Sequence, residues 1–165
     1  MTLSSEEQSV HFALNELKIS FVRFEHPPVF TVEQAEIQWA GVPGIHCKNL
    51  FLRNKKGNRH YLVILPGHKQ ADLKQLTRCL GTDRLSFASA ERLRRYLGLK
   101  PGSVSPFGLI NDSERTVSVV IDRELREAEA VSFHPNVNTA TLSLAFHDFE
   151  KFLDSRGNRI VYQDF

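Results

Sequence analysis

The sequence has 165 residues, of which 41% are hydrophobic and 24% are charged, and a net charge of +2. This length suits one domain with its own core, and the composition is typical of a soluble globular protein. No apolar run approaches the ~20 residues of a transmembrane helix, and the polar start MTLSSEEQSV is unlike a secretory signal. We therefore expect a cytoplasmic protein without a membrane partner. The small positive charge argues against a coat for long nucleic acids but permits contact with a few phosphates.

The predicted elements mix helices and strands along the chain. Ser4 and Glu7 match a capping box, and Val10 and Leu14 follow at helical spacing, which predicts a helix over 4–17. The later predicted elements are a strand at 19–26, a helix at 31–39, a hairpin of strands at 47–54 and 59–66, a helix at 67–81, a strand at 84–88, a helix at 89–98, a loop at 99–112 leading into a strand at 116–122, two strands within 131–146 around a polar insertion, a helix at 147–157 and a strand at 159–165.

Two of these strands carry a burial signal. The run YLVIL, residues 61–65, is apolar without alternation, which predicts a strand covered on both faces. Val117, Val119 and Ile121 alternate with other residues, which predicts a half-buried strand. The mixture of hairpins and helices predicts a single α+β domain over residues 1–165, built on a mainly antiparallel sheet.

The segment CKNLFLRN, residues 47–54, places Lys48 on one strand face with Leu50 and Leu52. An amine among leucines loses hydration, which lowers its pKa and favours the binding of an anion. The alternative is a lysine that extends from the strand end into solvent. Asn49 follows directly, so the two side chains can serve one pocket only if the strand start is irregular.

Two further polar stretches interrupt apolar segments. The first, bracketed by glycines and prolines, consists of Gly102, Ser103, Val104, Ser105 and Pro106. Its N–H groups could meet at one point as an anion nest or an oxyanion hole, and a plain turn is the alternative. The second stretch, FHPNVNTATLSL, contains His134, Asn136, Asn138 and Thr139. These side chains could position a substrate or satisfy a bend in the chain.

The sequence contains no motif for a hydrolase nucleophile, a nucleotide-binding loop or a metal site. The sequence contains no G-x-S-x-G, no G-x-x-x-x-G-K-[ST] and no G-x-G-x-x-G. The seven histidines have no metal-ligand spacing, and Cys47 and Cys79 read as free thiols. We therefore expect neither a metal nor another cofactor.

Four segments in this order resemble one family. KNLFLRN, YLVILPGHKQADLKQL, LGLKPGSVSPFGLIND and FHPNVNTATLSL are similar to the prolyl-tRNA-synthetase-associated (YbaK/ProX-like) editing domains of the free-standing type. The resemblance spans nearly the whole chain. It implies a curved, mostly antiparallel mixed sheet surrounded by helices, and an enzyme that hydrolyses the ester of a mischarged tRNA(Pro), with alanine as the wrong amino acid. The implied partners are the acceptor end of tRNA(Pro) and prolyl-tRNA synthetase.

The resemblance also implies roles for individual residues. The residues matched to the family's catalytic positions are Lys48, Asn49, Gly102, Ser103 and His134. The residues expected to line the substrate pocket are Val104, Ser105, Pro106, Asn136, Asn138 and Thr139. The family is thought to use the substrate's own ribose 2′-hydroxyl, which would explain the absence of an enzyme base.

Selection by size requires a further wall. One methylene in an apolar pocket is worth only ~1–3 kcal/mol, so a pocket that accepts alanine and rejects proline must exclude by bulk. Val29, Phe30 and Val32, after Pro27-Pro28, are the predicted wall. Two alternatives stay open: a deacylase of Cys-tRNA(Pro) or another aminoacyl-tRNA, and a non-catalytic module that binds tRNA or a synthetase.

Overall fold

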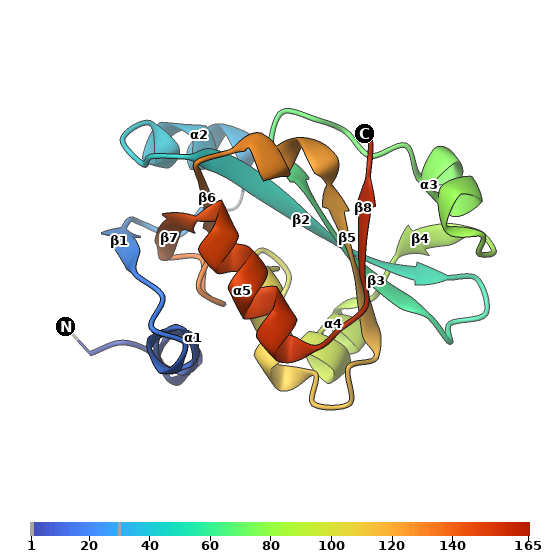
Figure 1. The fold of residues 1–165 in the computed structure, drawn as a ribbon, viewed down its shortest axis with the longest axis horizontal. Helices are drawn as coiled ribbons and strands as arrows, with labels where there is room; N and C mark the ends of the chain where they lie inside the picture. Colours follow the sequence, from blue (N-terminus) through green and yellow to red (C-terminus); the bar gives the residue numbers. More distant parts are fainter. Residues whose placement is uncertain (1, 30) are drawn as a thin grey trace.

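The structure, a computed structural model, describes residues 2–29 and 31–165. Its helices are α1 (Ser5–Glu16), α2 (Val32–Trp39), α3 (Leu73–Leu80), α4 (Ala90–Leu97) and α5 (Phe146–Arg156), with two 3₁₀ helices, η1 (Pro106–Asn111) and η2 (Arg123–Glu127). Its strands are β1 (Phe21–Glu25), β2 (Ile45–Asn54), β3 (His60–Pro66), β4 (Leu85–Phe87), β5 (Val117–Asp122), β6 (Ala130–Phe133), β7 (Ala140–Ala145) and β8 (Ile160–Gln163). Figure 1 shows α5 crossing one face of the sheet.

The described strands form one eight-stranded mixed sheet in the order β1-β7-β6-β2-β3-β5-β8, with β4 paired to β2 off this path. The pairs β1–β7, β6–β7, β2–β3 and β2–β4 are antiparallel. The pairs β2–β6, β3–β5 and β5–β8 are parallel. The predicted α+β class and the mixed, mainly antiparallel sheet are therefore confirmed.

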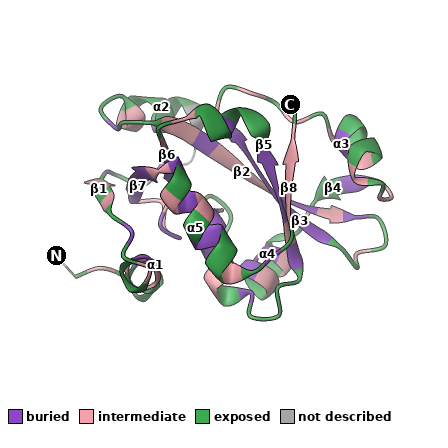
Figure 2. Ribbon diagram, viewed as in Figure 1, coloured by how far each residue is buried: buried purple, intermediate pink, exposed green. Residues whose placement is uncertain are grey.

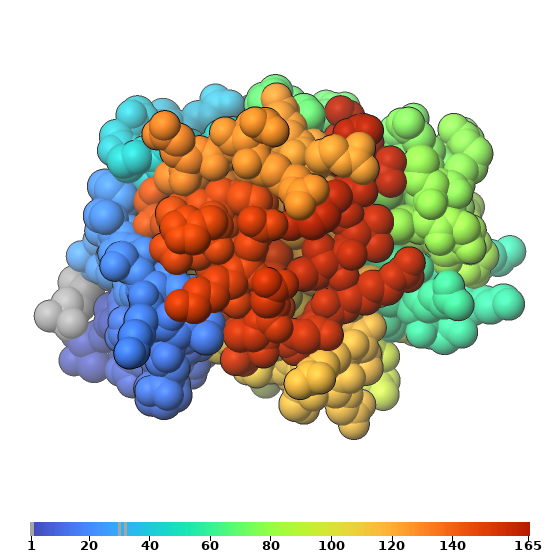
Figure 3. All heavy atoms as spheres, viewed as in Figure 1, coloured from blue at the N-terminus to red at the C-terminus, as the bar shows by residue number. Residues whose placement is uncertain are grey.

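Hydrophobic side chains are buried on both faces of the central strands. On one face, Phe51 and Leu62 pack in a core with the phenylalanines of η1 and α5. On the other face, Leu52 and Val63 pack with Leu76 of α3. Figure 2 shows the buried residues, in purple, concentrated in the central strands, and Figure 3 shows how α5 and its flanking segments cover the face turned to the viewer. None of the helices in the described part of the chain combines the length and the apolar character that a membrane crossing requires.

The burial signals were half right. Every residue of β3 is buried, as YLVIL predicted. The prediction of a half-buried strand at 116–122 was wrong, because Val119, Val120 and Ile121 are all fully buried. β5 lies between β3 and β8 in parallel pairing, and parallel strands are usually covered on both faces.

One helix boundary and two short helices also differ from prediction. The helix predicted at 67–81 begins only at Leu73, because the Asp72 carboxylate caps it by accepting from the N–H groups of Lys74 and Gln75. The loop predicted at 99–112 contains η1, and η2 was not predicted. Both 3₁₀ helices are short, and hydrophobic periodicity gives little signal over one or two turns.

The edge of β2 that faces away from β3 is interrupted. β6 pairs with Ile45 and His46 at its start, and β4 pairs with residues 52–54 at its end. Among the described strands, none pairs with residues 47–51 on this edge. We call this interval the sheet gap, and Lys48 and Asn49 lie within it.

Candidate active site

Lys48 and Asn49 lie in the middle of a regular strand. β2 pairs with β3 without interruption from Cys47 to Arg53, and Lys48 lies opposite Leu65. The side chains of Lys48 and Asn49 therefore point to opposite faces, and the expected irregular strand start is absent. The Lys48 ammonium forms no hydrogen bond or ion pair with the described residues, and partial burial lowers its pKa.

The backbone of Asn49 is directed to the sheet gap. In an antiparallel pair, alternate residues turn their backbone groups toward the partner strand. The Gly67 N–H donates to His46 O on the β3 side, whereas the Ala88 N–H donates to Phe51 O on the opposite side. Asn49 has the same parity as Phe51, so its N–H and C=O face the gap rather than β3.

The side chain of Asn49 connects β2 to the predicted loop. Asn49 Nδ2 donates to Val104 O at 3.3 Å. Asn49 Oδ1 is buried and accepts no hydrogen bond from the described residues. A buried acceptor without a partner is costly, so a bound donor at this position would stabilise the site.

The loop from Gly102 to Ser105 carries unused donors. Gly102 has φ +87°, which favours glycine, and a Cβ there would meet no atom within 4 Å. The Ser103 N–H donates to Lys100 O and closes a turn. The N–H groups of Gly102, Val104 and Ser105 donate to no group of the described chain. An anion nest is formed by unused backbone N–H groups of this kind, close together in one loop.

Ser105 and Pro106 have a structural task. Ser105 is fully buried, and its hydroxyl accepts from the Phe107 N–H at the start of η1. Pro106 occupies the first turn, where a missing N–H costs nothing. The ring of Phe107 then packs edge-on against Phe133 of β6, with centroids 5.9 Å apart. These contacts fix the loop beside the residue that precedes His134.

His134 follows β6 at the point where β6 leaves β2. β6 is aligned with β2 through the pair His46–Ser132, and continuing this register would place His134 level with Lys48. Its Nδ1 lies 3.0 Å from Ala140 O; a carbonyl only accepts, so Nδ1 carries the hydrogen and Nε2 holds a lone pair. Burial lowers the pKa of His134, so the ring is neutral at pH 7.

The segment after β1 joins the His134 loop, and it contains a residue that sequence reasoning missed. The ring centroid of His26 lies 5.9 Å from that of His134, and His26 Nε2 lies 2.9 Å from Thr141 Oγ1. The His26 N–H donates to Thr139 O. The signal available was the repeated His-Pro, which occurs at 26–27 and 134–135.

The structure describes only part of the expected pocket wall. Asn138 Nδ2 approaches Val29 O at 3.5 Å, and Val29 is buried. Phe30 lies outside the described residues, as does the side chain of Val32. Asn136 is buried with φ +63°.

Asn136 borders a different hollow, of about 210 Å³, which is also lined by Ser5, Gly98 and Asn111. The Oδ1 atom of Asn136 accepts no hydrogen bond from the described residues. This position favours a role in shaping the loop over direct contact at the sheet gap.

The remaining candidates for metal or thiol chemistry are poorly placed. Cys47 is buried, and burial raises the pKa of its thiol well above the ordinary value, which disfavours the reactive thiolate. In the part of the chain that the structure describes, no group of three or more His, Cys, Asp or Glu side chains is arranged to hold a metal ion.

Comparison with known proteins gives matches over most of the chain. A family model described as the aminoacyl-tRNA editing domain matches residues 26–152. The chain is 46% identical over 153 residues to prolyl-tRNA editing protein ProX of Acetoanaerobium sticklandii, covering 92% of this chain and 93% of that protein. It is 35% identical over 154 residues to prolyl-tRNA synthetase associated domain-containing protein 1 of Danio rerio, covering 92% and 83%.

A solved structure gives the same fold. The crystal structure of a proposed trans-editing enzyme for prolyl tRNA synthetase matches with a TM-score of 0.74 at 23% identity, covering 99% of each chain. The sequence matches and the fold together bear out the resemblance seen in the four motifs. The chain belongs to the aminoacyl-tRNA editing domain family.

Proposed function

We propose that this protein hydrolyses the ester of mischarged tRNA(Pro) in trans, with Ala-tRNA(Pro) as its preferred substrate. The observation that carries the proposal is the contact of Asn49 with the loop whose Gly102, Val104 and Ser105 N–H groups are unused, beside the sheet gap, in a chain of the editing family. The pairing of β6 with β2 directs His134 to the level of Lys48 in the same interval. Family membership supports the predicted enzyme class, an aminoacyl-tRNA deacylase. The name of the ProX relative supports tRNA(Pro) as the substrate.

The reaction needs an oxyanion site more than a nucleophile. Water adds to the ester carbonyl carbon, the ribose oxygen leaves with a proton, and the products are the amino acid and the free tRNA. Charge develops on the carbonyl oxygen in the tetrahedral intermediate, and one N–H donor aimed at it is typically worth ~3 kcal/mol. The free N–H groups of Gly102, Val104 and Ser105 are candidates for this task.

Two acceptors at the site match the other end of the substrate. The α-ammonium group of an aminoacyl ester requires hydrogen-bond acceptors when it leaves water. Asn49 Oδ1 and the Nε2 lone pair of neutral His134 have no partner among the described residues. We assign one of these acceptors to the ammonium group and the other to the attacking water.

Lys48 acts through charge and position. Its ammonium is free of carboxylates in the described structure, and it lies on the strand face opposite to Asn49. A phosphate or ribose oxygen of the terminal nucleotide is the group that such an amine would bind. Holding this nucleotide fixes the ester relative to the loop donors, which is a positioning effect.

Substitution of Lys48 tests the proposal. Lys48→Ala should lower the deacylation rate of Ala-tRNA(Pro) by about 10²-fold or more, because the ester is no longer held in place. The matched control is Lys74→Ala on the exposed side of α3, which should keep the wild-type rate. Circular dichroism and thermal melting should show that both variants stay folded. A wild-type rate in the Lys48 variant would contradict the assigned role.

The amino acid is tested with the same preparation. Ala-tRNA(Pro) and Cys-tRNA(Pro) should be compared side by side, and the alanyl ester should have the higher kcat/KM. A higher kcat/KM for the cysteinyl ester would replace alanine by cysteine in the proposal. Tight tRNA binding without turnover of either ester would instead favour the non-catalytic binding module.

A further inference from the structure

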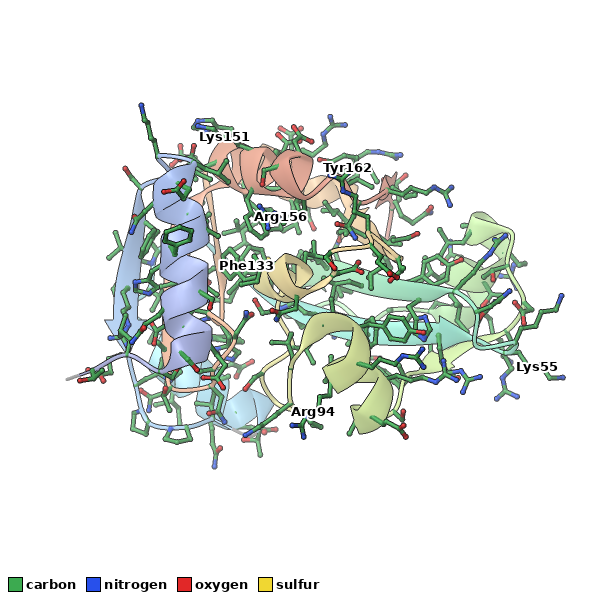
Figure 4. All side chains as sticks on the ribbon, turned by 90° about the horizontal axis from the view of Figure 1, so that it is seen from below. Lys55, Arg94, Phe133, Lys151, Arg156 and Tyr162 are labelled. Atoms are coloured by element: carbon green, nitrogen blue, oxygen red, sulfur yellow. The ribbon has the colours of Figure 1, made fainter. Side chains whose placement is uncertain are left out.

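Seven cationic side chains lie on two elements that contact each other through the Arg92–Gly57 hydrogen bond. They come from the β2–β3 hairpin and from α4, and we call them the basic surface: Arg53, Lys55, Lys56, Arg59, Arg92, Arg94 and Arg95. Figure 4 shows Lys55 at the tip of the hairpin and Arg94 on α4, whereas Lys151 and Arg156 lie on α5 at the opposite side.

Two of the arginines are held close together. A Cβ at Gly57 would lie 2.8 Å from Arg53 Nη2 and 2.9 Å from Arg92 Nη2, so the two guanidinium groups are near neighbours. Arg53 Nη2 donates to Lys55 O and Arg92 Nη1 donates to Gly57 O. Like charges repel at such separations, so the hairpin carbonyls keep in place an arrangement that electrostatics alone would open.

His60 beneath them is suited to this arrangement. Its ring contacts the ring of Tyr96 of α4 in a tilted arrangement with centroids 4.0 Å apart, and Arg92 Nη1 lies 3.0 Å from His60 Nε2. Burial, and then Arg92, Arg53 and Arg95, lower the pKa of His60 to about 4. The neutral ring accepts a hydrogen bond from Arg92 without adding a further positive charge.

The basic surface lacks counter-charges within the protein. No described carboxylate forms an ion pair with any of its seven side chains, whereas Arg23, Lys69 and Arg123 elsewhere are all paired. The nearby carboxylates are Glu91, exposed on α4, and Asp83. Asp83 accepts hydrogen bonds from Asn54 and from the Lys56 N–H instead. Unpaired guanidinium groups, of which those of Arg53 and Arg92 are held by hairpin carbonyls, match phosphate.

The elements of the basic surface lead directly to the sheet gap. Asn49, Phe51 and Arg53 occupy alternate positions of β2 and share one face. Four residues of strand separate Asn49 from Arg53 by about 14 Å. On the other side, α4 ends at Leu97, five residues before Gly102. A nucleic acid whose 3′ end enters the gap would therefore pass over the arginines.

We propose that the basic surface binds the phosphate backbone of the acceptor stem of the tRNA, with the Arg53–Arg92 pair nearest the unpaired 3′ end. This inference rests on the proposed function for the identity of the RNA. Backbone contacts position a nucleic acid without reading its sequence. Discrimination among tRNAs would then come from elsewhere, and the surface sets affinity and orientation.

Direct binding tests the surface without reference to catalysis. The probe is uncharged, fluorescently labelled tRNA(Pro) titrated by anisotropy at several salt concentrations. The double variant Arg94→Ala/Arg95→Ala should raise Kd about tenfold and reduce the slope of log K against log salt by about 2, one for each lost phosphate contact. The matched control, Lys151→Ala/Arg156→Ala on α5, removes the same charge and should leave both quantities unchanged. Arg92→Gln should act like the double variant, with a slope change of about 1.

Kinetics separate this inference from the proposed function. The second substrate is a short aminoacyl fragment, 3′-alanyl-CCA, which lacks the stem. The α4 variant should lose kcat/KM on full-length Ala-tRNA(Pro) and keep it on the fragment. Equal Kd and salt slope in wild type and the α4 variant would overturn the docking surface even if hydrolysis persists, as would an equal loss in the α5 control. Loss of tRNA binding in the α4 variant, together with a wild-type protein that hydrolyses neither ester, would uphold the surface and reject the deacylase.

Discussion

Gly102 and Gly81 share a backbone conformation but not a neighbourhood. Their φ values are +87° and +63°, and a Cβ at either position would meet no atom within 4 Å. Alanine at either position should lower the free energy of unfolding by about 1 kcal/mol, because left-handed backbone disfavours a side chain. Only Gly102→Ala should also lower kcat for the aminoacyl ester, by up to about 10²-fold, because the strained turn moves the loop N–H groups.

The comparison of the two glycine variants needs urea unfolding and single-turnover hydrolysis. Gly81 caps α3, far from the sheet gap, so its variant controls for the loss of stability. Equal turnover in the two variants would remove the loop from the oxyanion site.

The protonation of His134 predicts a pH profile. Its pKa is lowered from 6.5, chiefly by burial, so the ring should be mostly neutral at pH 7 and above. The enzymatic rate, corrected for spontaneous hydrolysis, should not decline between pH 8 and pH 7 on account of His134, and should fall at lower pH as Nε2 takes a proton. A His134→Gln variant should lose this acidic limb. An acidic limb centred above pH 7 would show that another group controls the rate.

At the scale of secondary-structure elements, one buried carboxylate ties α1 to β1. Glu7 is 2% exposed, and both its oxygens accept hydrogen bonds from Arg23, at 2.6 and 3.0 Å. His11 Nε2 lies 2.9 Å from the same carboxylate. Glu7→Gln should lower the free energy of unfolding by about 2–3 kcal/mol, because a charge-assisted pair is lost in a buried place.

Chemical denaturation measures this loss, and the adjacent Glu6 supplies the control. Glu6 is exposed on the first turn of α1, so Glu6→Gln should cost no more than about 1 kcal/mol. Similar losses in the two variants would mean that the Glu7–Arg23 pair contributes nothing beyond the helix terminus.

The same scale explains what the sequence could predict. The sequence predicted α1 and α4 well, because the capping side chains and the hydrophobic periodicity indicate the same helix. It also predicted the β2–β3 hairpin from its turn residues. The alternation of apolar residues over 116–122 led to the wrong prediction of a half-buried strand. The burial of β5 depends on its neighbours β3 and β8, which are distant in sequence. Lys48 and Asn49 were predicted together by resemblance, yet strand alternation separates their side chains, as local pattern alone had warned.

At the scale of the whole molecule, one ring joins the core to the site. Phe107 is fully buried, and it packs on Phe152 of α5 as well as on Phe133. Phe107→Ala should lower the free energy of unfolding by about 3–5 kcal/mol, or roughly 2–4 °C of Tm for each kcal/mol. Calorimetry measures this loss, and hydrolysis below the melting range should also be slower because the loop loses its anchor.

The control for Phe107 is Phe87→Ala in β4, where the ring is 63% exposed and its removal should change Tm little. A folded Phe107 variant with full activity would show that the loop holds its shape independently of the core.

The sequence identified the stretches at the candidate site because polar residues interrupt apolar strands there. It could not identify His26, whose place beside His134 depends on the pairing of β1 with β7.

The sheet gap also constrains the length of β2. Its ten residues serve β6 at one end and β4 at the other. Deleting two residues from the middle would keep every remaining side chain on its own face, since alternation has a period of two. It would nevertheless bring the ends of β6 and β4 together and leave no room for the two loops between them. The spacing of the strand, as much as any residue on it, therefore sets the width of the sheet gap.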